Sequence, residues 1–390
     1  MDIKDKLVYL YIANTDTTIT LENARQFITI DIITRILKNY FNYSIMYSTN
    51  TKLDLNQLCI EKPSYIISNV SVIEHIQKLI DNNFAYIDEY GIYFDIDEYE
   101  TGVDYVHIDN NILWEFTNEE PCFESPWGNG RPSLYIESAA ACPNNVHIYS
   151  GSDNIIGFNS VLLDEKWAEI KLNVEKIKTK MNFNDFIEKY NINILRLLCI
   201  LNNWDSKITN LNESCDHAIK FNNTLNEFMI IIQNYIYVYR NYPVKTNKDI
   251  LSNLEIASRA INEAFSTFNT NKVSKELLKI INLTHDYINS EKIPDSVTLN
   301  CIFKFMKKIL LVFGIGIHEI TFTKTQEDYD NLLNDTIDVR NQIISIFKNS
   351  DYSVSDKLNN LWDISETIRN KLKKYNLRLI DEQKLNVLRL

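Results

Sequence analysis

The chain has 390 residues, of which 45% are hydrophobic and 24% charged, so it is long enough for two or three domains with ordinary globular cores. Its formal net charge of −12 disfavours binding to DNA or to an anionic membrane, and its most apolar runs, at 228–239 and 309–317, are too short to span a bilayer. Six cysteines without a C-x-x-C pair, and the absence of a secretory leader, predict reduced thiols in a cytoplasmic protein.

The first 50 residues show the pattern of a β-α-β unit. Residues 6–13 are apolar and rich in β-formers, which predicts a strand. Apolar residues at helical spacing follow at 22–41 and predict a helix, and SIMYST at 44–49 predicts a second strand. Because two strands joined by a helix are usually parallel, the first half is predicted to be α/β with a parallel sheet.

An acidic stretch follows. Between Lys78 and Arg131 there is no lysine or arginine, whereas thirteen acidic residues occur from Asp81 to Glu124. Within this stretch, AYIDEYGIYFDI at 85–96 predicts a β-hairpin that turns around Glu89-Tyr90-Gly91.

The segment SPWGNGRPSLYIESAAA, residues 125–141, contains two of the chain's 8 glycines and two of its 7 prolines. Glycine and proline mark places where the backbone must follow a particular path. We expect a scaffold turn that leads into a strand or a helix. In it, Trp127 would be packed, Gly128 and Gly130 would have conformations that favour glycine, and Arg131 would pair with an acid.

From about residue 184, apolar residues recur at three-and-four spacing, which predicts an all-helical second half, most simply an antiparallel bundle. Cys215-Asp216-His217 in this half predicts an exposed helix turn and no metal or nucleophile site, because consecutive residues of a helix do not face each other. His107 and His147, each in a V-H-I triplet, are predicted to be strand or core positions.

Four segments resemble, in order, the motifs HIGNARxFxxxDxxxRxL, SPWGxGRPGWHIECSAM, EKMSKSLGNF and IRDELxxxGIxLED of one family. They are LENARQFITIDIITRIL at 21–37, SPWGNGRPSLYIESAAA at 125–141, EKIKTKMNF at 175–183 and IRNKLKKYNLRLID at 368–381. The family is that of the cysteinyl-tRNA synthetases, which are class I aminoacyl-tRNA synthetases. The matches cover nearly the whole chain, although the chain is shorter than is usual for the family.

This resemblance implies a fold of the class α/β then all-α. A Rossmann-type catalytic domain would occupy residues 1–170, with the acidic insertion at about 80–125. A KMSKS-like loop and helices similar to the stem-contact region would follow at 171–245, and a helical bundle resembling the anticodon-binding domain at 246–390.

The HIGH-like positions depart from the family at the site where ATP phosphates bind. They are Thr20, Leu21, Glu22 and Asn23, so that the first histidine is lost and a carboxylate would face a polyphosphate. The alternative interpretation of this stretch is a helix N-cap followed by a first-turn acid.

The other nucleotide motifs are partly kept. The KMSKS-like lysines are Lys176, Lys178 and Lys180, which are either a solvated basic loop or retained phosphate or RNA contacts. Gly151 and Asp153 match the family's nucleotide-cradling HGGGSD motif and are the ATP-like positions.

The family's zinc ligands, two Cys, a His and a Glu, have no counterparts of the same type here. The first cysteine position falls between Tyr11 and Ala13, the second is Ser138, and the segment with the His/Glu pair is replaced by NIIGFNS at 154–160. Cys142 lies four residues past Ser138, and one displaced thiol does not make a zinc site. We therefore predict that zinc is absent and that no cofactor is needed, with ATP bound only if activity survives.

The leading hypothesis is a catalytically inactive cysteinyl-tRNA synthetase-like protein, retained as a structural or interaction scaffold with an unidentified protein partner. The first alternative is a tRNA- or RNA-binding module that uses the helical half, including Lys371, Lys373 and Lys374 of the basic tail. The second is a divergent but active cysteine–tRNA ligase, which would need ATP near Asp153 and Lys178.

Overall fold

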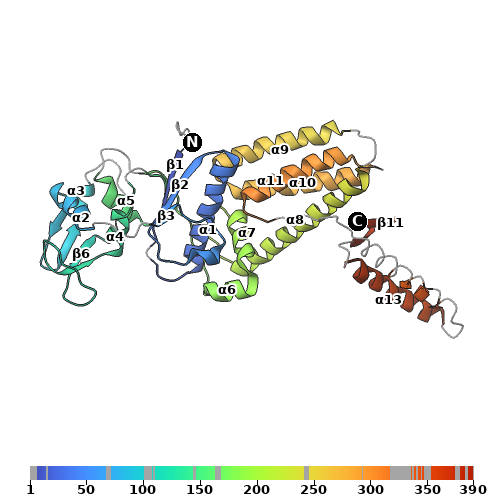
Figure 1. The fold of residues 1–390 in the computed structure, drawn as a ribbon, viewed down its shortest axis with the longest axis horizontal. Coiled ribbons are helices and arrows are strands. Elements are labelled where there is room, and N and C mark those ends of the chain that lie inside the picture. Colours follow the sequence, from blue (N-terminus) through green and yellow to red (C-terminus); the bar gives the residue numbers. More distant parts are fainter. Residues whose placement is uncertain are drawn as a thin grey trace. The chain divides into compact units, whose positions relative to one another are not determined.

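Figure 1 shows the computed structural model, which describes most of the chain. The chain divides into two compact units. The first unit comprises 1–222, 260–275 and 312–315, and the second 223–259, 276–311 and 316–390. His107, Lys374 and the side chains of Lys371 and Lys373 lie outside what is described. The described residues are 7–14, 16–66, 72–100, 108, 110–143, 146–162, 168–240, 246–291, 293–316, 335, 338–339, 341–343, 345–346, 353–373, 378–382 and 385–389.

A parallel sheet of five strands, in the order β3-β2-β1-β8-β9, forms the base of the first unit. Its strands are β1 (Leu7–Ile12), β2 (Ser44–Thr49), β3 (Tyr65–Ile66), β8 (Val146–Ser150) and β9 (Ala168–Lys171). The central strand β1 pairs in parallel with β2 on one side, Leu7 opposite Ser44, and with β8 on the other, Leu10 opposite Ile148. The predicted β-α-β unit and its two strands are confirmed.

Helix α1 (Leu21–Arg35) connects β1 to β2 and continues as a π-helical turn, η1 (Ile36–Tyr40). Twelve of the fifteen residues of α1 are buried, so the helix is enclosed on nearly all sides. A helix buried in this way must find partners for every polar side chain it contains, because an unpaired buried polar group costs free energy.

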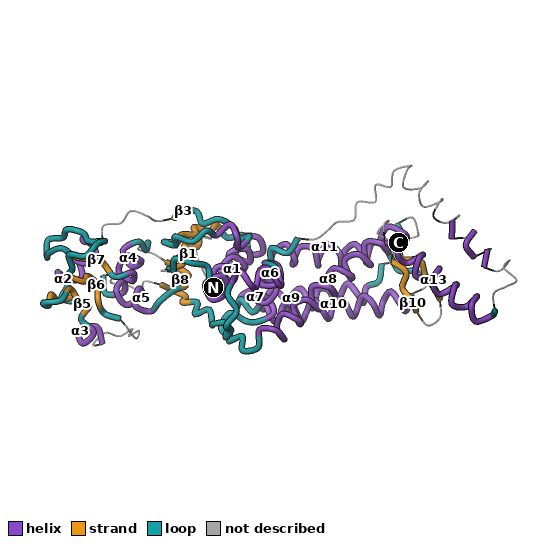
Figure 2. The backbone as a smooth tube through the Cα atoms, turned by 90° about the horizontal axis from the view of Figure 1, so that it is seen from below, coloured by secondary structure: helices purple, strands orange, loops and turns teal. Residues whose placement is uncertain are grey.

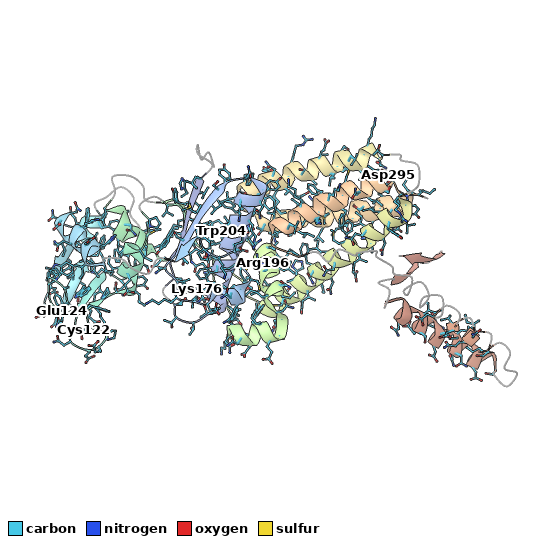
Figure 3. The ribbon with its side chains drawn as sticks, in the orientation of Figure 1. Cys122, Glu124, Lys176, Arg196, Trp204 and Asp295 are labelled. Carbon is cyan, nitrogen blue, oxygen red and sulfur yellow. The ribbon has the colours of Figure 1, made fainter. Side chains whose placement is uncertain are left out.

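Asp31 of α1 is the polar centre of this packing. Its carboxylate accepts hydrogen bonds from Arg196 at 2.6 Å, from Arg35 at 2.9 Å and from the amide N–H of Glu61 at 2.8 Å. The side chains of Asp31 and Arg196 are only 1% and 5% exposed (Arg196 is labelled in Figure 3). Arg196 also donates to the carbonyl oxygens of Cys59 and Phe313, so this network joins four separate parts of the first unit.

The acidic stretch forms a second sheet, which is antiparallel, with the strand order β4-β5-β6-β7. The strands of the two sheets form separate groups (Figure 2). The predicted hairpin is confirmed, since β4 and β5 pair with Tyr86 opposite Tyr93. Apart from β3, the described elements between β2 and β8 are η2 (Leu55–Leu58), α2 (Val72–Asp81), β4 (Ala85–Ile87), β5 (Gly91–Phe94), α3 (Ile96–Glu100), β6 (Ile112–Phe116), β7 (Gly130–Pro132) and α4 (Leu134–Ala140).

The segment 125–132 follows β6, ends with β7 and leads into α4. Its predicted features are mostly confirmed. The ring of Trp127 packs edge-on against Trp114, Arg131 pairs with Glu115 at 2.7 Å, and Gly128 has a φ of +133°. The prediction for Gly130 is wrong, because its φ is not positive. A Cβ at Gly130 would instead overlap the backbone oxygen of Glu115 and the indole of Trp114, so close strand packing requires this glycine.

The remaining regular elements of the described chain are helices, except for one hairpin. The hairpin, β10 (Arg378–Glu382) with β11 (Leu385–Arg389), is a departure from the all-helical prediction, and its short segments have no extended alternating pattern that marks them as strands. The helices are α5 (Asp153–Ser160), α6 (Phe183–Tyr190), α7 (Ile192–Leu201), α8 (Leu211–Tyr239), α9 (Lys248–Ser266), α10 (Thr270–Ser290), α11 (Ser296–Val312) and α13 (Val354–Lys373).

Two predictions about single residues are resolved by these elements. Cys215-Asp216-His217 lies in α8 as predicted, with Asp216 and His217 exposed, but Cys215 is fully buried. His147 lies in β8, where its Nδ1 accepts a hydrogen bond from the amide of Tyr9 at 3.1 Å, so its assignment to a strand is confirmed.

Asp31→Asn is expected to lower the free energy of unfolding by about 3–5 kcal/mol, because it leaves two arginines, one of them buried, without their shared counter-charge. Chemical denaturation of the purified variant measures this loss. Glu263→Gln is the control, since its ion pair with Lys272 is exposed and its removal should cost less than about 1 kcal/mol. A loss of the same size in both variants would show that Asp31 does not stabilise the fold through its charge.

Candidate functional site

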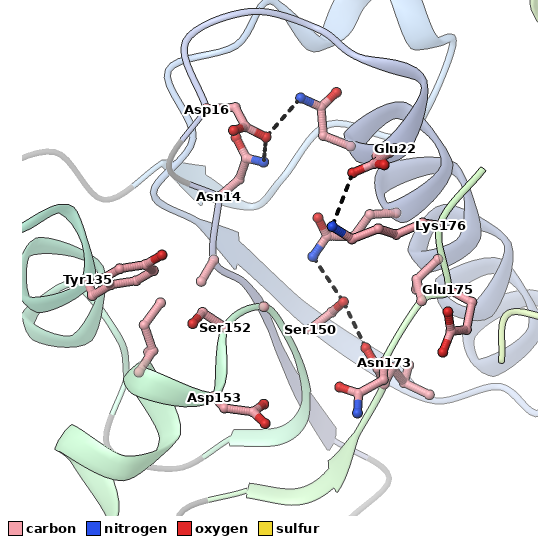
Figure 4. A pocket seen from close by; sticks show the side chains of 17 residues that line it. Asn14, Asp16, Glu22, Tyr135, Ser150, Ser152, Asp153, Asn173, Glu175 and Lys176 are labelled. Atoms are coloured by element: carbon pink, nitrogen blue, oxygen red, sulfur yellow. Dashed lines mark hydrogen bonds and ion pairs between the residues drawn. The ribbon is translucent and has the colours of Figure 1, made fainter. Parts of the chain in front are cut away.

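A pocket of about 480 Å³ opens at the carboxyl ends of β1 and β8 (Figure 4). The chain leaves β1 toward β2 on one side, and β8 lies on the other side, so the pocket is at the point where the strand order reverses. Open α/β sheets bind ligands at this point. The walls come from the residues after β1, the first turn of α1, the β8–α5 turn and the segment after β9.

Thr20 caps the N-terminus of α1. Its Oγ1 accepts a hydrogen bond from the amide of Asn23 at 3.2 Å, and the Asn23 side chain accepts one from the amide of Thr20 at 2.9 Å. This reciprocal pair is a capping box, and Glu22 lies in the first turn. The N-cap interpretation of the HIGH-like stretch is confirmed. The amides that could bind a phosphate at this helix end are therefore partly used by the protein itself.

Glu22 faces Lys176 across the pocket, with 3.7 Å between the carboxylate and the ammonium group (Figure 4). Lys176 lines the pocket, whereas Lys178 and Lys180 are exposed and do not. Of the three predicted lysines, the structure thus brings one to the pocket, and a carboxylate already pairs with it.

The pocket as a whole is acidic. Four carboxylates line it, those of Asp16, Glu22, Asp153 and Glu175, against one lysine, Lys176. Asp153 in turn pairs with Lys171, whose pKa is lowered by its partial burial. This charge balance opposes a polyphosphate and favours a neutral or cationic group.

Gly151 and Asp153 lie in the turn between β8 and α5. A side chain at Gly151 would come within 2.8 Å of the Cβ of Ala13 and still closer to the hydroxyl of Tyr149, so only glycine fits there. The Tyr149 hydroxyl donates to the carbonyl of Ser152 at 2.8 Å, and the Ser152 side chain caps α5. The turn therefore keeps a compact shape beside the pocket.

Arg25 fixes the wall that contains Lys176. It is fully buried, and its guanidinium donates to four backbone carbonyls: Glu175 at 2.7 Å, Lys176 at 3.4 Å, Asn203 at 2.9 Å and Ser206 at 2.8 Å. Burial lowers the pKa of Arg25. The KIKTK loop, residues 176–180, and the preceding Glu175 also form backbone hydrogen bonds with 204–208. Lys178 N–H donates to the carbonyl of Ile208, and Glu175 N–H donates to that of Trp204. The sequence prediction did not include Arg25, although it lies within the HIGNAR-like segment.

The zinc-ligand positions form a buried hydroxyl cluster. The Tyr11 hydroxyl donates to the backbone oxygen of Ser138 at 3.0 Å, and the side chain of Asn50 donates to Ser138 Oγ at 2.6 Å. Tyr11, Ser138 and Tyr149 are fully buried, with the rings of Tyr11 and Tyr149 stacked at 6.3 Å. The structure thus brings Tyr11, which begins the stretch 11–13 predicted to contain the first ligand position, together with Ser138, and the two bond to each other and to their neighbours.

This cluster does not suit zinc. Burial raises the pKa of Tyr11, of Tyr149 and of the neighbouring Cys142 thiol, so all three stay protonated near neutral pH. Zinc requires deprotonated thiolate, carboxylate or neutral imidazole ligands. Within the part of the chain that the structure describes, no group of three His, Cys, Asp or Glu residues is placed to hold a metal.

Comparison with known proteins relates the chain to cysteine–tRNA ligases. The chain is 27% identical over 383 residues to the cysteine–tRNA ligase of Methanococcus aeolicus, covering 83% of this chain and 77% of that one. It is 24% identical over 395 residues to that of Saccharolobus solfataricus, covering 88% and 80%. The chain is a homologue of cysteine–tRNA ligases. No protein-family model matches the chain.

The fold of this synthetase homologue agrees with that relationship. The methionyl-tRNA synthetase of Mycobacterium tuberculosis superposes with a TM-score of 0.56 at 9% identity, covering 79% of the homologue and 87% of that chain. The predicted class I synthetase fold, α/β followed by helices, is confirmed. Among the described helices of the homologue, none combines the length and apolar character needed to cross a bilayer.

Glu22→Gln is expected to strengthen ATP binding about fivefold. The substitution removes the negative charge that lies 3.7 Å from the ammonium group of Lys176, and one charge at such a distance contributes on the order of 1 kcal/mol in a solvated site. Calorimetric titration of both proteins with ATP measures the ratio of dissociation constants. Glu188→Gln, an exposed position on α6 outside the pocket, should leave binding unchanged. Equal affinities for the Glu22 variant and the parent, or no binding by either at millimolar ATP, would contradict a controlling role for Glu22.

Proposed function

We propose that this homologue does not activate cysteine and is retained as a binding scaffold with the fold of a synthetase. The observation on which this rests is the hydroxyl cluster of Tyr11 and Ser138. By the resemblance, Ser138 matches one ligand of the metal that selects cysteine in this family, and Tyr11 begins the stretch 11–13 that contains the match to another. Here they are buried, protonated and hydrogen-bonded to their neighbours.

The phosphate end of the pocket supports the same proposal. Formation of an aminoacyl adenylate requires positive or hydrogen-bond-donating groups around the transferring phosphate. At this end Thr20 is occupied in the capping box and Lys176 faces Glu22, while Lys178 and Lys180 do not line the pocket. Loss of phosphate contacts and of metal ligands would leave the scaffold intact, since Gly151 and Arg25 shape the pocket walls.

Cysteine-dependent ATP–pyrophosphate exchange tests this proposal, with zinc measured on the same purified sample. We expect exchange at the background rate and less than about one-tenth zinc per chain, because each structural zinc requires four suitable ligands. The cysteine–tRNA ligase of Methanococcus aeolicus, assayed in parallel, is the positive control. Exchange well above background by a correctly folded sample would refute the proposal, and stoichiometric zinc would refute its explanation.

We propose tRNA as a second candidate ligand of the scaffold. The favouring observation is the parallel bridge between Ile177 and Ile208, which brings the KIKTK loop beside the segment that contains Lys207. Lys178 and Lys180 lie on one segment and Lys207 on the other, and all three are exposed. Exposed lysines on adjacent segments suit contacts with RNA phosphates.

Lys178→Glu is expected to weaken tRNA binding at low salt about tenfold or more, and to make the dependence of affinity on salt less steep. Filter binding across a salt series measures both quantities. Lys52→Glu, an equally exposed reversal away from this loop, is the matched control. Equal weakening by the two variants would mean that only total charge matters, and the loop would be rejected as a tRNA contact.

A further inference from the structure

The outer strand of the antiparallel sheet, β4 (Ala85–Ile87), has one open edge. Among the described strands it pairs with β5 alone. Asp88 N–H donates to Gly91 and Asp95 N–H to Phe84, so the hydrogen-bonded positions of β4 are 84, 86 and 88. In an antiparallel ladder the intervening residues turn their polar groups the other way. The exposed Ile87 therefore presents its backbone N–H and C=O groups to the open edge, whereas Ala85 is buried.

Large side chains beside this edge are exposed on both faces of the strand. Tyr86 is 46% exposed, Ile87 53% and Tyr90 66%. The ring of Tyr86 stacks on that of Tyr93, and a hydrogen bond from the Tyr90 hydroxyl to the Glu89 carboxylate raises the pKa of Tyr90. An open strand edge flanked by aromatic and aliphatic surface is the arrangement to which extended peptides add as a further strand.

The charge at this edge indicates what such a peptide contains. Natural sheets usually protect an open edge with lysine or proline, and this one has neither, since no base occurs between Lys78 and Arg131. Asp88 and Glu89 form the adjacent turn, and thirteen acids lie in the same stretch. Carboxylates beside tyrosine rings suit arginine and lysine, through ion pairs and cation–π contacts. A second copy of this edge would bring like charges together.

We propose that β4 is a docking edge for an extended, Lys/Arg-rich segment of another protein, which adds to the sheet as a fifth strand. The backbone groups of Ile87 would pair with the segment, while Asp88, Glu89 and the exposed tyrosines select its basic side chains. This surface is separate from the pocket, so the inference holds whether or not the pocket is catalytically active.

Ile87→Pro tests the proposal. Proline removes the N–H of residue 87, which points to the open edge, and leaves the ladder with β5 intact. The probe is a fluorescein-labelled ten-residue peptide that alternates valine with lysine and arginine, and fluorescence anisotropy reports its binding to the full chain. We expect binding by the parent protein, weakening of about tenfold or more in Ile87→Pro, and loss of most binding at high salt, where the Debye length falls to about 3 Å.

Two further proteins make the test decisive. Asp88→Asn/Glu89→Gln keeps the strand and should also weaken binding severalfold, so the proposal stays testable if the proline variant does not fold. Phe123→Ala, an exposed side chain beside β7 at the other end of the sheet, should bind like the parent. The proposal is overturned by absence of binding to the parent, by equal binding of a peptide with glutamate in place of the bases, or by unchanged binding in the Ile87 and Asp88/Glu89 variants. A doubled mass in light scattering that Ile87→Pro abolishes would also overturn it, because the occupant would then be a second copy.

Discussion

The buried guanidinium of Arg25 is the contact on which the shape of the pocket depends. It makes hydrogen bonds to four carbonyl oxygens from two segments, 175–176 and 203–206, and none of these partners is a carboxylate. Moving such a cation out of water costs several kcal/mol, whereas each bond to a charged group returns about 1.5–3 kcal/mol. The guanidinium is therefore stable inside the protein only when most of its partners are in place. Helix α1, the KIKTK loop and residues 203–206 must consequently adopt their positions together, and the wall beside Lys176 has little freedom to move.

The positions that resemble the family's motifs also have structural roles in this chain. Thr20 caps a helix, and Tyr11 and Ser138 complete a buried hydrogen-bond cluster. These side chains satisfy a requirement of folding, that a helix end or a buried polar group should have a partner. The synthetase fold persists around them because its core residues on β1, β8 and α1 remain apolar and closely packed.

Local elements could be predicted from the sequence where the spacing of apolar residues was clearly that of a strand or of a helix, as in β1, α1, β2 and the hairpin at 85–96. The sequence left 134–140 open between strand and helix, because seven residues with two alanines fit either, and the Ser133 cap decides for the helix. We predicted an unusual φ for Gly130. A glycine is needed there because Trp114 approaches its backbone closely, and no local pattern reveals such a tertiary contact. The roles of Arg25 and Asn50 were missed for the same reason, since their partners lie far away in sequence. Lys176 could not be separated from Lys178 by spacing alone.

The capping box at Thr20 also has an evolutionary consequence. A return to histidine at this position would remove the side-chain oxygen that accepts from Asn23, at a cost of about 1 kcal/mol in helix stability. Cysteine at positions 11 and 138 would likewise remove the hydrogen bonds that the Tyr11 hydroxyl donates and the Ser138 hydroxyl accepts. Each of these substitutions would lower the stability of the fold, so selection for stability alone opposes the appearance of the ligase motifs one residue at a time.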